Sequence, residues 1–152
     1  MAASAAFVQA PDPDNPGWTT WDIDDPNRFN PQVMGRMIVR PEGDNGARFR
    51  MVEPRLLHAN LHGGLNGGVI LALVDIALFA TLHVASDSDA SGSVTLDINC
   101  QFIGPGSLER PVDVVSEVLR ETRRLAFLRG IVEQGDTLVA SYSGTLRKLS
   151  TR

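Results

Sequence analysis

Cysteine is almost absent from this sequence: Cys100 is the single one among 152 residues. One cysteine excludes an internal disulfide, and its free thiol fits a reducing cytoplasm. Basic clusters are missing too. The formal net charge is −4 and the isoelectric point is about 5.3, which excludes an extended nucleic-acid surface. The first ten residues lack the basic start and apolar core of a secretory signal. These absences favour a soluble cytoplasmic protein with one domain.

A long uninterrupted apolar run is absent as well. The most apolar stretch, Val69–Ala85, contains Asp75 and His83 and is shorter than the ~20 residues that a membrane span needs, so no membrane contact is expected. A helix that is apolar almost all round must then lie in a protein core. A carboxylate such as Asp75 is costly in such a helix unless it is paired, hydrogen-bonded or used in chemistry.

The first 32 residues form a compositionally separate arm, rich in proline and aspartate, which includes Trp18, Trp21 and Phe29. We expect residues 1–32 to be irregular, with the aromatic rings packed on the surface and a helical turn as an option near Pro26–Asn30. Residues 33–152 are expected to form the folded domain.

Within the domain, one helix is expected from about Gly67 to Val84, between two groups of strands. The expected strands are Val33–Arg40, Ala47–Val52, Ser93–Phe102, Val112–Arg120, Leu125–Glu133 and Leu138–Leu149. Strands joined by short turns pair antiparallel, and such a sheet must bury one face against the apolar helix. The sequence therefore predicts an α+β fold in which an antiparallel sheet curls around one long central helix.

The loop before the helix is rich in glycine and reads NLHGGLNGG over 60–68. Glycines at a helix start leave backbone N–H groups open to a polar ligand, where the helix dipole contributes partial positive charge. Together with Asp75, this arrangement is typical of a site in which the helix start polarises a substrate group. The acid then attacks that group or activates a water to do so.

This loop and helix resemble the hot-dog-fold acyl-CoA thioesterases of the phenylacetate-pathway (PaaI-like) type. The signature of that family is Asn-x-x-Gly-x-x-His-Gly-Gly, followed by an apolar helix with Asp nine residues after the His. The positions that fit it without a gap are Asn60, Gly63, Gly67, Gly68 and Asp75. The segments TLDINCQFIGP and RLAF also resemble the family, and the resemblance covers about residues 33–149. It implies the hot-dog fold and hydrolysis of an acyl-CoA, without a metal or a cofactor beyond the coenzyme A of the substrate.

The sequence departs from the signature at Asn66, which stands where the family has histidine. A separate HGG triplet begins at His62, but aligning it would need a four-residue insertion before Asp75 and would take Asn60 and Gly63 off the pattern. We prefer the ungapped alignment. An asparagine amide can still donate a hydrogen bond to the loop or to a substrate carbonyl.

The resemblance implies a catalytic role for each matching position. The acid at Asp75 either attacks the thioester carbonyl or activates a water, and the sequence leaves both roles open. The N–H of Gly67 would bind the thioester oxygen. Asn60 would position the loop or its water, and Thr95 would help to hold the attacking water. The structural alternatives are an acid satisfied by backbone donors, a turn-stabilising asparagine and a threonine that favours a strand.

Four further residues are expected to contact substrate. Gly68 and His62 lie in the glycine-rich loop, and Arg123 and Arg124 form a basic pair in a turn that suits the phosphates of coenzyme A, unless they are simply solvated. His58 and His62 are four residues apart. They lie in a loop rather than on a helix and lack the glutamate of a zinc-hydrolase motif, so no metal site is expected.

Two alternative functions stay open at this point: an acyl-CoA-binding protein without turnover, and a dehydratase acting on 3-hydroxyacyl thioesters. The spacing also bears on assembly. Gly67 and Asp75 are separated by about 12 Å along one helix, too far to act on one carbonyl. Two antiparallel helices can supply both groups. We therefore predict a homodimer joined along Ser93–Phe102, with a homotetramer left open.

Overall fold

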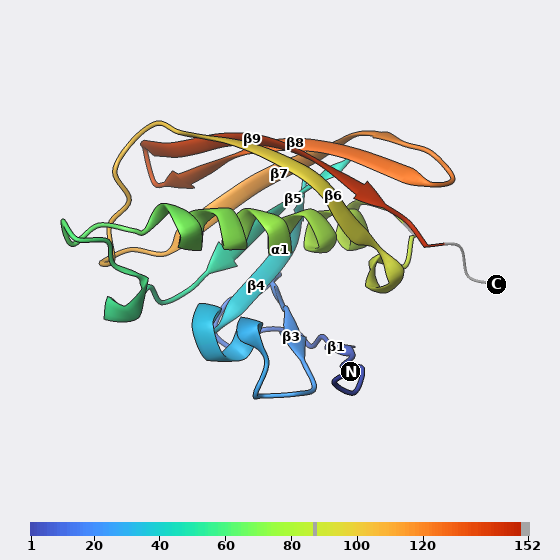
Figure 1. Cartoon of the computed structure of the whole chain (residues 1–152), viewed down its shortest axis with the longest axis horizontal. Coiled ribbons are helices and arrows are strands. Elements are labelled where there is room, and N and C mark those ends of the chain that lie inside the picture. Colours follow the sequence, from blue (N-terminus) through green and yellow to red (C-terminus); the bar gives the residue numbers. More distant parts are fainter. Residues whose placement is uncertain (87, 150–152) are drawn as a thin grey trace.

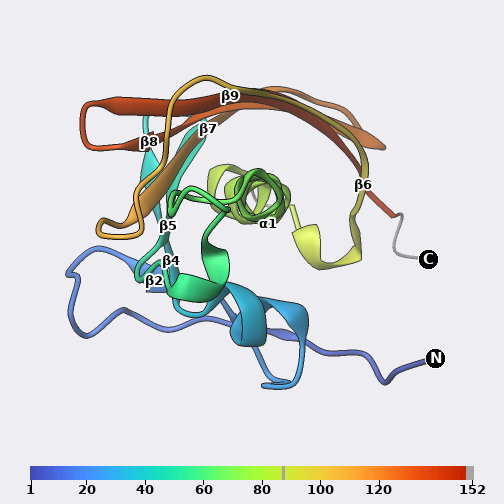
Figure 2. The same ribbon diagram turned by 60° about the vertical axis from the view of Figure 1, so that its left-hand side comes forward.

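Helix α1, Gly67–Ala85, lies on the concave side of a curved antiparallel sheet (Figures 1 and 2). The computed structural model describes residues 1–86 and 88–149. The seven-stranded sheet has the order β2-β4-β5-β7-β8-β9-β6. Its strands are β2 (Thr19–Thr20), β4 (Met37–Glu42), β5 (Gly46–Met51), β6 (Val94–Phe102), β7 (Val112–Glu121), β8 (Leu125–Gln134) and β9 (Thr137–Arg147). This architecture confirms the predicted antiparallel sheet curled around a central helix.

The helix is buried because apolar side chains project from most of its circumference. Leu73, Val74, Ala77 and Leu78 have no exposed surface, and α1 packs most closely on β5 and β7. The sheet approaches the helix closely at Gly144 of β9, because a Cβ atom there would lie only 2.7 Å from Leu78 Cδ1. By length and composition α1 is able to cross a membrane, but here it is the core helix.

The strand expected at Val33–Arg40 is wrong over its first residues. Asn30–Met34 form a short π-helical segment, η1, with Pro31 in its first turn. Proline has no N–H for a β-ladder and suits the start of a helix. Gly35 ends the segment with φ of +72°, and β4 begins at Met37. The helical turn considered near Pro26–Asn30 therefore lies a few residues later. The other expected elements begin and end within two residues of the observed ones.

The N-terminal arm is more regular and more tightly attached than its composition indicates. Its strands β1 (Phe7–Val8) and β3 (Asp22–Ile23) pair with each other, and β2 pairs with β4 of the main sheet. The arm passes along the side of α1 opposite the sheet (Figure 2). From the sequence we expect the Trp21 ring to pack on the surface. The structure shows instead that Trp21 is buried, with 1% of its surface exposed. The arm therefore covers a part of the helix that the curved sheet leaves open.

Candidate active site

The carboxylate of Asp75 is held by a side chain from the neighbouring strand. Asp75 lies in the middle of α1 and is half-buried. Thr95 of β6 donates a hydrogen bond from its hydroxyl to Asp75 Oδ1 over 2.6 Å. The register of β6 against β9 shifts between Thr95 and Asp97, and such irregularities commonly re-aim side chains beside functional sites. The structure thus brings together two of the residues singled out in the sequence.

A cavity of about 270 Å³ opens beside this carboxylate, and we call it the Asp75 pocket. Its walls come from the arm, from α1 and from the segment that leads into β6. The residues that line it are Phe7, Trp21, Asn30, Asp75, Ile76, Phe79, Ser91 and Ser93. Sequence reasoning identified Asp75 alone, because the arm reaches the pocket through tertiary packing and no local motif marks that contact.

The first turn of α1 offers a free backbone donor. Asn66 is the N-cap residue, and its Oδ1 accepts a hydrogen bond from Gly68 N over 2.8 Å. Gly67 N donates no hydrogen bond within the described part of the chain. Because Asn66 occupies the Gly68 N–H, the Gly67 N–H is the donor left at the helix start, where the helix dipole is positive. Asn66 is a preferred N-cap residue type, a signal that the sequence contained.

Asn60 closes the glycine-rich loop on itself. Its Oδ1 accepts hydrogen bonds from His62 N at 2.8 Å and from Gly64 N at 3.1 Å, and its Nδ2 donates to Leu65 O at 3.3 Å. Gly63 has φ of +81°, a conformation that favours glycine. The observed contacts of Asn60 therefore position the loop that precedes Gly67.

Gly67 lines a second cavity of about 440 Å³, which we call the Gly67 pocket. Its walls come from the glycine-rich loop, α1 and the loop after β6. They comprise Asn60, His62, Gly64, Leu65, Gly67, Ile70, Phe102, Gly104, Pro105 and Gly106. No residue lines both this pocket and the Asp75 pocket. Within one chain, Gly67 and Asp75 consequently line different cavities.

The remaining residues singled out in the sequence lie apart from these pockets or support the fold. His58 has no exposed surface, and its ring nitrogens contact Arg55 N and Val33 O. Arg123 and Arg124 are exposed in the β7–β8 turn and line neither pocket. Within residues 1–86 and 88–149, no group of three or more metal-ligating side chains forms.

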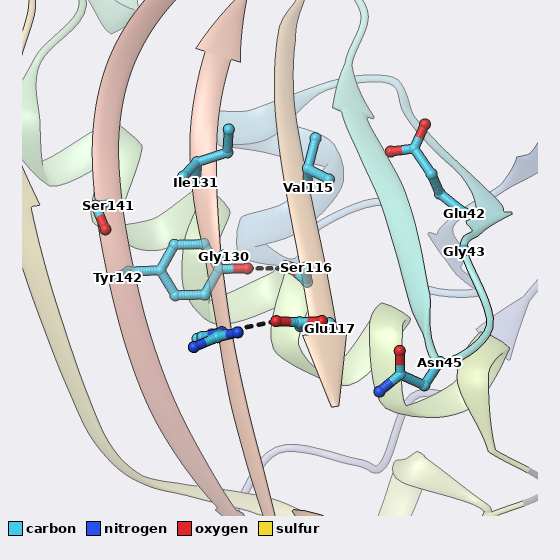
Figure 3. Close-up of a pocket in the computed structure, with 11 residues that line it drawn as sticks. Glu42, Gly43, Asn45, Val115, Ser116, Glu117, Gly130, Ile131, Ser141 and Tyr142 are labelled. Atoms are coloured by element: carbon cyan, nitrogen blue, oxygen red, sulfur yellow. Dashed lines mark hydrogen bonds and ion pairs between the residues drawn. The ribbon is translucent and has the colours of Figure 1, made fainter. Parts of the chain in front are cut away.

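A third cavity, of about 410 Å³, lies on the face of the sheet that points away from α1 (Figure 3). Its carboxylates are paired: Glu117 with Arg129 at 2.6 Å, and Glu42 with Arg48 at 3.1 Å. Tyr142 shares a hydrogen bond with Ser116, and burial raises the pKa of its phenol well above the usual range. The phenol stays protonated at neutral pH. These contacts are typical of a packed sheet and leave the chemistry to the Asp75 and Gly67 pockets.

The comparison with known families decides the identity of the domain. The profile of the thioesterase superfamily matches residues 62–141, which include Gly67, Asp75 and Thr95. The chain belongs to the thioesterase superfamily. This assignment confirms the resemblance seen in the sequence and names the curled sheet as a hot-dog fold. No curated protein gives a significant match.

Several solved structures share this architecture. A conserved protein of Pseudomonas aeruginosa is 27% identical, with a TM-score of 0.69, and the match covers 80% of this chain and 94% of that one. The phenylacetic acid degradation protein PaaI of Thermus thermophilus, solved as a mutant, is 26% identical, with a TM-score of 0.64. The match covers 80% of this chain and 100% of that one. A hypothetical thioesterase of Streptococcus pneumoniae, solved with coenzyme A, is 15% identical, with a TM-score of 0.63. The match covers 76% of this chain and 88% of that one.

Proposed function

We propose that this superfamily member is a cytoplasmic enzyme that hydrolyses acyl-CoA thioesters to a free acid and coenzyme A. The observation that carries the proposal is the half-buried Asp75 carboxylate, which accepts the Thr95 hydroxyl and faces a cavity. Superfamily membership supports the reaction class. The thioesterase that was solved with coenzyme A shares the fold and supports coenzyme A as the carrier of the acyl group.

The reaction needs one base or nucleophile and one donor for the developing oxyanion. In the general-base form, Asp75 takes a proton from water while the water oxygen attacks the thioester carbon. The Gly67 N–H stabilises the negative charge on the carbonyl oxygen. The C–S bond then breaks, and coenzyme A leaves as a thiolate that takes up a proton. In the nucleophilic form, Asp75 attacks the carbon itself and the C–S bond breaks, which releases the coenzyme A thiolate and leaves a mixed anhydride. Water then cleaves this anhydride to the free acid and restores the Asp75 carboxylate. Neither form requires a cofactor or a metal.

Two chains would supply one complete site. Gly67 and Asp75 are separated by about 12 Å along the axis of α1, and they line separate cavities. Strand β6 ends the sheet order and exposes Val94, Leu96 and Phe102. Pairing two β6 edges about a twofold axis would extend the sheet, cover these apolar groups and align the two helices. We propose a homodimer of this kind, in which Gly67 of one subunit faces Asp75 of the other, and two such dimers can form a tetramer.

The loop residues and the exposed arginines complete the proposed site. Asn60 holds the loop, Asn66 caps the Gly68 N–H and leaves its own amide Nδ2 as a donor, and His62 borders the Gly67 pocket. Arg123 and Arg124 are solvent-accessible, as residues that bind the phosphates of coenzyme A need to be.

Release of free thiol from a panel of acyl-CoAs tests the proposal. The panel spans aromatic, short and long acyl groups. Steady release of one coenzyme A per acyl group hydrolysed is expected. Saturable binding without release would instead show a non-catalytic acyl-CoA-binding protein. Hydration of an enoyl-CoA in the absence of thiol release would show a dehydratase.

A further inference from the structure

The arm supplies one whole wall of the Asp75 pocket. Phe7, Trp21 and Asn30 come from three separate parts of the arm and line the cavity with Ile76 and Phe79 of α1. The ring centroids of Phe7 and Trp21 are 4.7 Å apart. The superfamily profile begins only at residue 62, so this wall lies outside the matched domain. It is a feature through which this chain can differ from other members of the superfamily.

Hydrogen bonds, strand pairing and a ring contact fix the position of this wall. Trp21 N donates a hydrogen bond to Met37 O of β4 over 2.9 Å. Strand β3 begins at the residue after Trp21 and pairs with β1, which contains Phe7. The Trp21 ring also meets the His83 ring edge-on at 5.6 Å. Because strands and rings hold it, the arm presents a defined surface to whatever enters the pocket.

Two buried polar atoms of residues that line the pocket lack partners. Trp21 Nε1 and Ser93 Oγ form no hydrogen bond within the described part of the chain. Trp21 is 1% exposed and Ser93 is 9% exposed. Buried donors and acceptors are nearly always satisfied in folded proteins. Both residues line the pocket, so we take their unpaired polar groups as the partners of a polar atom in the ligand.

The size of the pocket limits the ligand. At 270 Å³ it lies below the range of about 300–1,000 Å³ that is typical of sites for drug-sized ligands. At roughly 30 Å³ per heavy atom, the space that a water molecule occupies in the liquid, it holds no more than about nine heavy atoms. A short acyl group fills this space, whereas a long fatty-acyl chain would have to extend past the wall formed by the arm.

We propose that the N-terminal arm selects the acyl group. The Trp21 ring restricts the site to short acyl chains, and the Trp21 indole N–H donates a hydrogen bond to an oxygen carried by the acyl group. This inference rests on the proposed function, because it takes an acyl-CoA as the ligand. Trp21 is then a specificity residue contributed by a segment outside the matched superfamily domain.

Matched substrates and variants separate the two parts of the proposal. The substrates are hexanoyl-CoA, 5-oxohexanoyl-CoA and dodecanoyl-CoA. The wild type is expected to prefer 5-oxohexanoyl-CoA over hexanoyl-CoA by about tenfold in kcat/KM, since sites with unpaired buried donors discriminate against analogues without the acceptor. Trp21→Phe keeps a ring but removes the N–H, so it should lose this preference and keep the length limit. Trp21→Ala should raise the ratio of kcat/KM for dodecanoyl-CoA to kcat/KM for hexanoyl-CoA by at least about tenfold.

The control is Trp18→Phe. Trp18 stacks against Arg40 and Arg50 and does not line the pocket, so both ratios should stay at the wild-type values. Phe7→Ala opens the same wall from a residue that is 37% exposed, and it provides the length test if Trp21→Ala does not fold. An unchanged dodecanoyl to hexanoyl ratio in the folded variants would overturn the length limit. Equal kcat/KM for the two hexanoyl substrates in the wild type would overturn the role of the indole N–H.

Binding distinguishes failure of this inference from failure of the proposed function. A variant with Trp18→Phe and Asp75→Asn retains Trp21 as its single tryptophan. Its fluorescence should change saturably with 5-oxohexanoyl-CoA and stay constant with coenzyme A alone. The matched variant with Trp21→Phe and Asp75→Asn should not respond. A Trp21 response without any hydrolysis by the wild type would reject the thioesterase proposal and leave the pocket assignment standing. Hydrolysis with a silent Trp21 would reject the arm's role and leave the thioesterase proposal standing.

Discussion

Replacing Asp75 with asparagine tests the chemistry of the site while leaving its shape nearly unchanged. The side chain is half-buried and accepts one hydrogen bond from Thr95 over 2.6 Å. An asparagine Oδ1 can accept the same bond, but the Nδ2 that replaces Oδ2 cannot take a proton from water or attack a carbonyl. Loss of a positioned acid–base group costs at least about a hundredfold in rate. That factor corresponds to about 2.7 kcal/mol in the activation free energy.

The assay is thiol release from the best acyl-CoA of the panel, at saturating substrate, together with a thermal unfolding curve for each protein. We predict that Asp75→Asn lowers kcat at least about a hundredfold and leaves a cooperative unfolding transition. Asp136→Asn is the matched control, because Asp136 is an exposed acid in the β8–β9 turn. A folded Asp75→Asn enzyme with near-normal turnover would remove Asp75 from the mechanism.

Three other predictions concern the groups around the site and the acid stability of the fold. Thr95→Val removes the hydroxyl that orients Asp75, and we expect thiol release to slow by about tenfold, in line with a lost hydrogen bond to a charged group; an unchanged rate would make Thr95 a strand residue only. Asn66→Ala should lower turnover and cost about 1 kcal/mol of unfolding free energy as a lost N-cap, whereas Asn66→His should keep or raise turnover; wild-type behaviour of the alanine variant would contradict this. Burial alone would raise the pKa of Glu121, but hydrogen bonds, foremost from Lys148, outweigh it and hold the pKa below the usual value. The stability that Glu121 adds is therefore present above its unfolded pKa of about 4.3 and is lost as pH falls through the lower folded pKa. Lys148→Met should flatten the loss of stability measured by urea unfolding between neutral and acid pH, and an unaltered pH dependence would refute the pairing.

The sequence was sufficient for the helix and for the six longer strands of the main sheet, apart from the start of β4, because their signals are local. The alternation from Val94 to Phe102 and the apolar run after Gly67 each mark one element over many residues. The glycine-rich loop and Asp75 could be found for the same reason, since their spacing along the chain carries the family signature. Asn66 could also have been identified as the helix cap from its residue type and place.

The arm could not be predicted in this way. Its first strands are two residues long, too short for a periodic pattern. Trp21 is buried by contacts with Met37, Phe7 and His83, and none of these is adjacent to it in the sequence. The Asp75 pocket is therefore a product of tertiary packing. The same holds for the separation of the two cavities, because the arm lines one beside the middle of α1 and the loop after β6 lines the other at its start.

The most direct test of the shared site combines two inactive subunits in one dimer. One subunit carries Asp75→Asn. The other carries Gly67→Val, since an added Cβ at Gly67 would lie 3.4 Å from Phe102 Cε1 and a larger group would fill the pocket. Each parent dimer is expected to be nearly inactive in thiol release. In a purified mixed dimer, the intact Gly67 of the first subunit meets the intact Asp75 of the second, so about half of the wild-type activity per dimer should return from one of two equivalent sites. A verified mixed dimer as inactive as its parents, or an active monomer, would contradict the shared site.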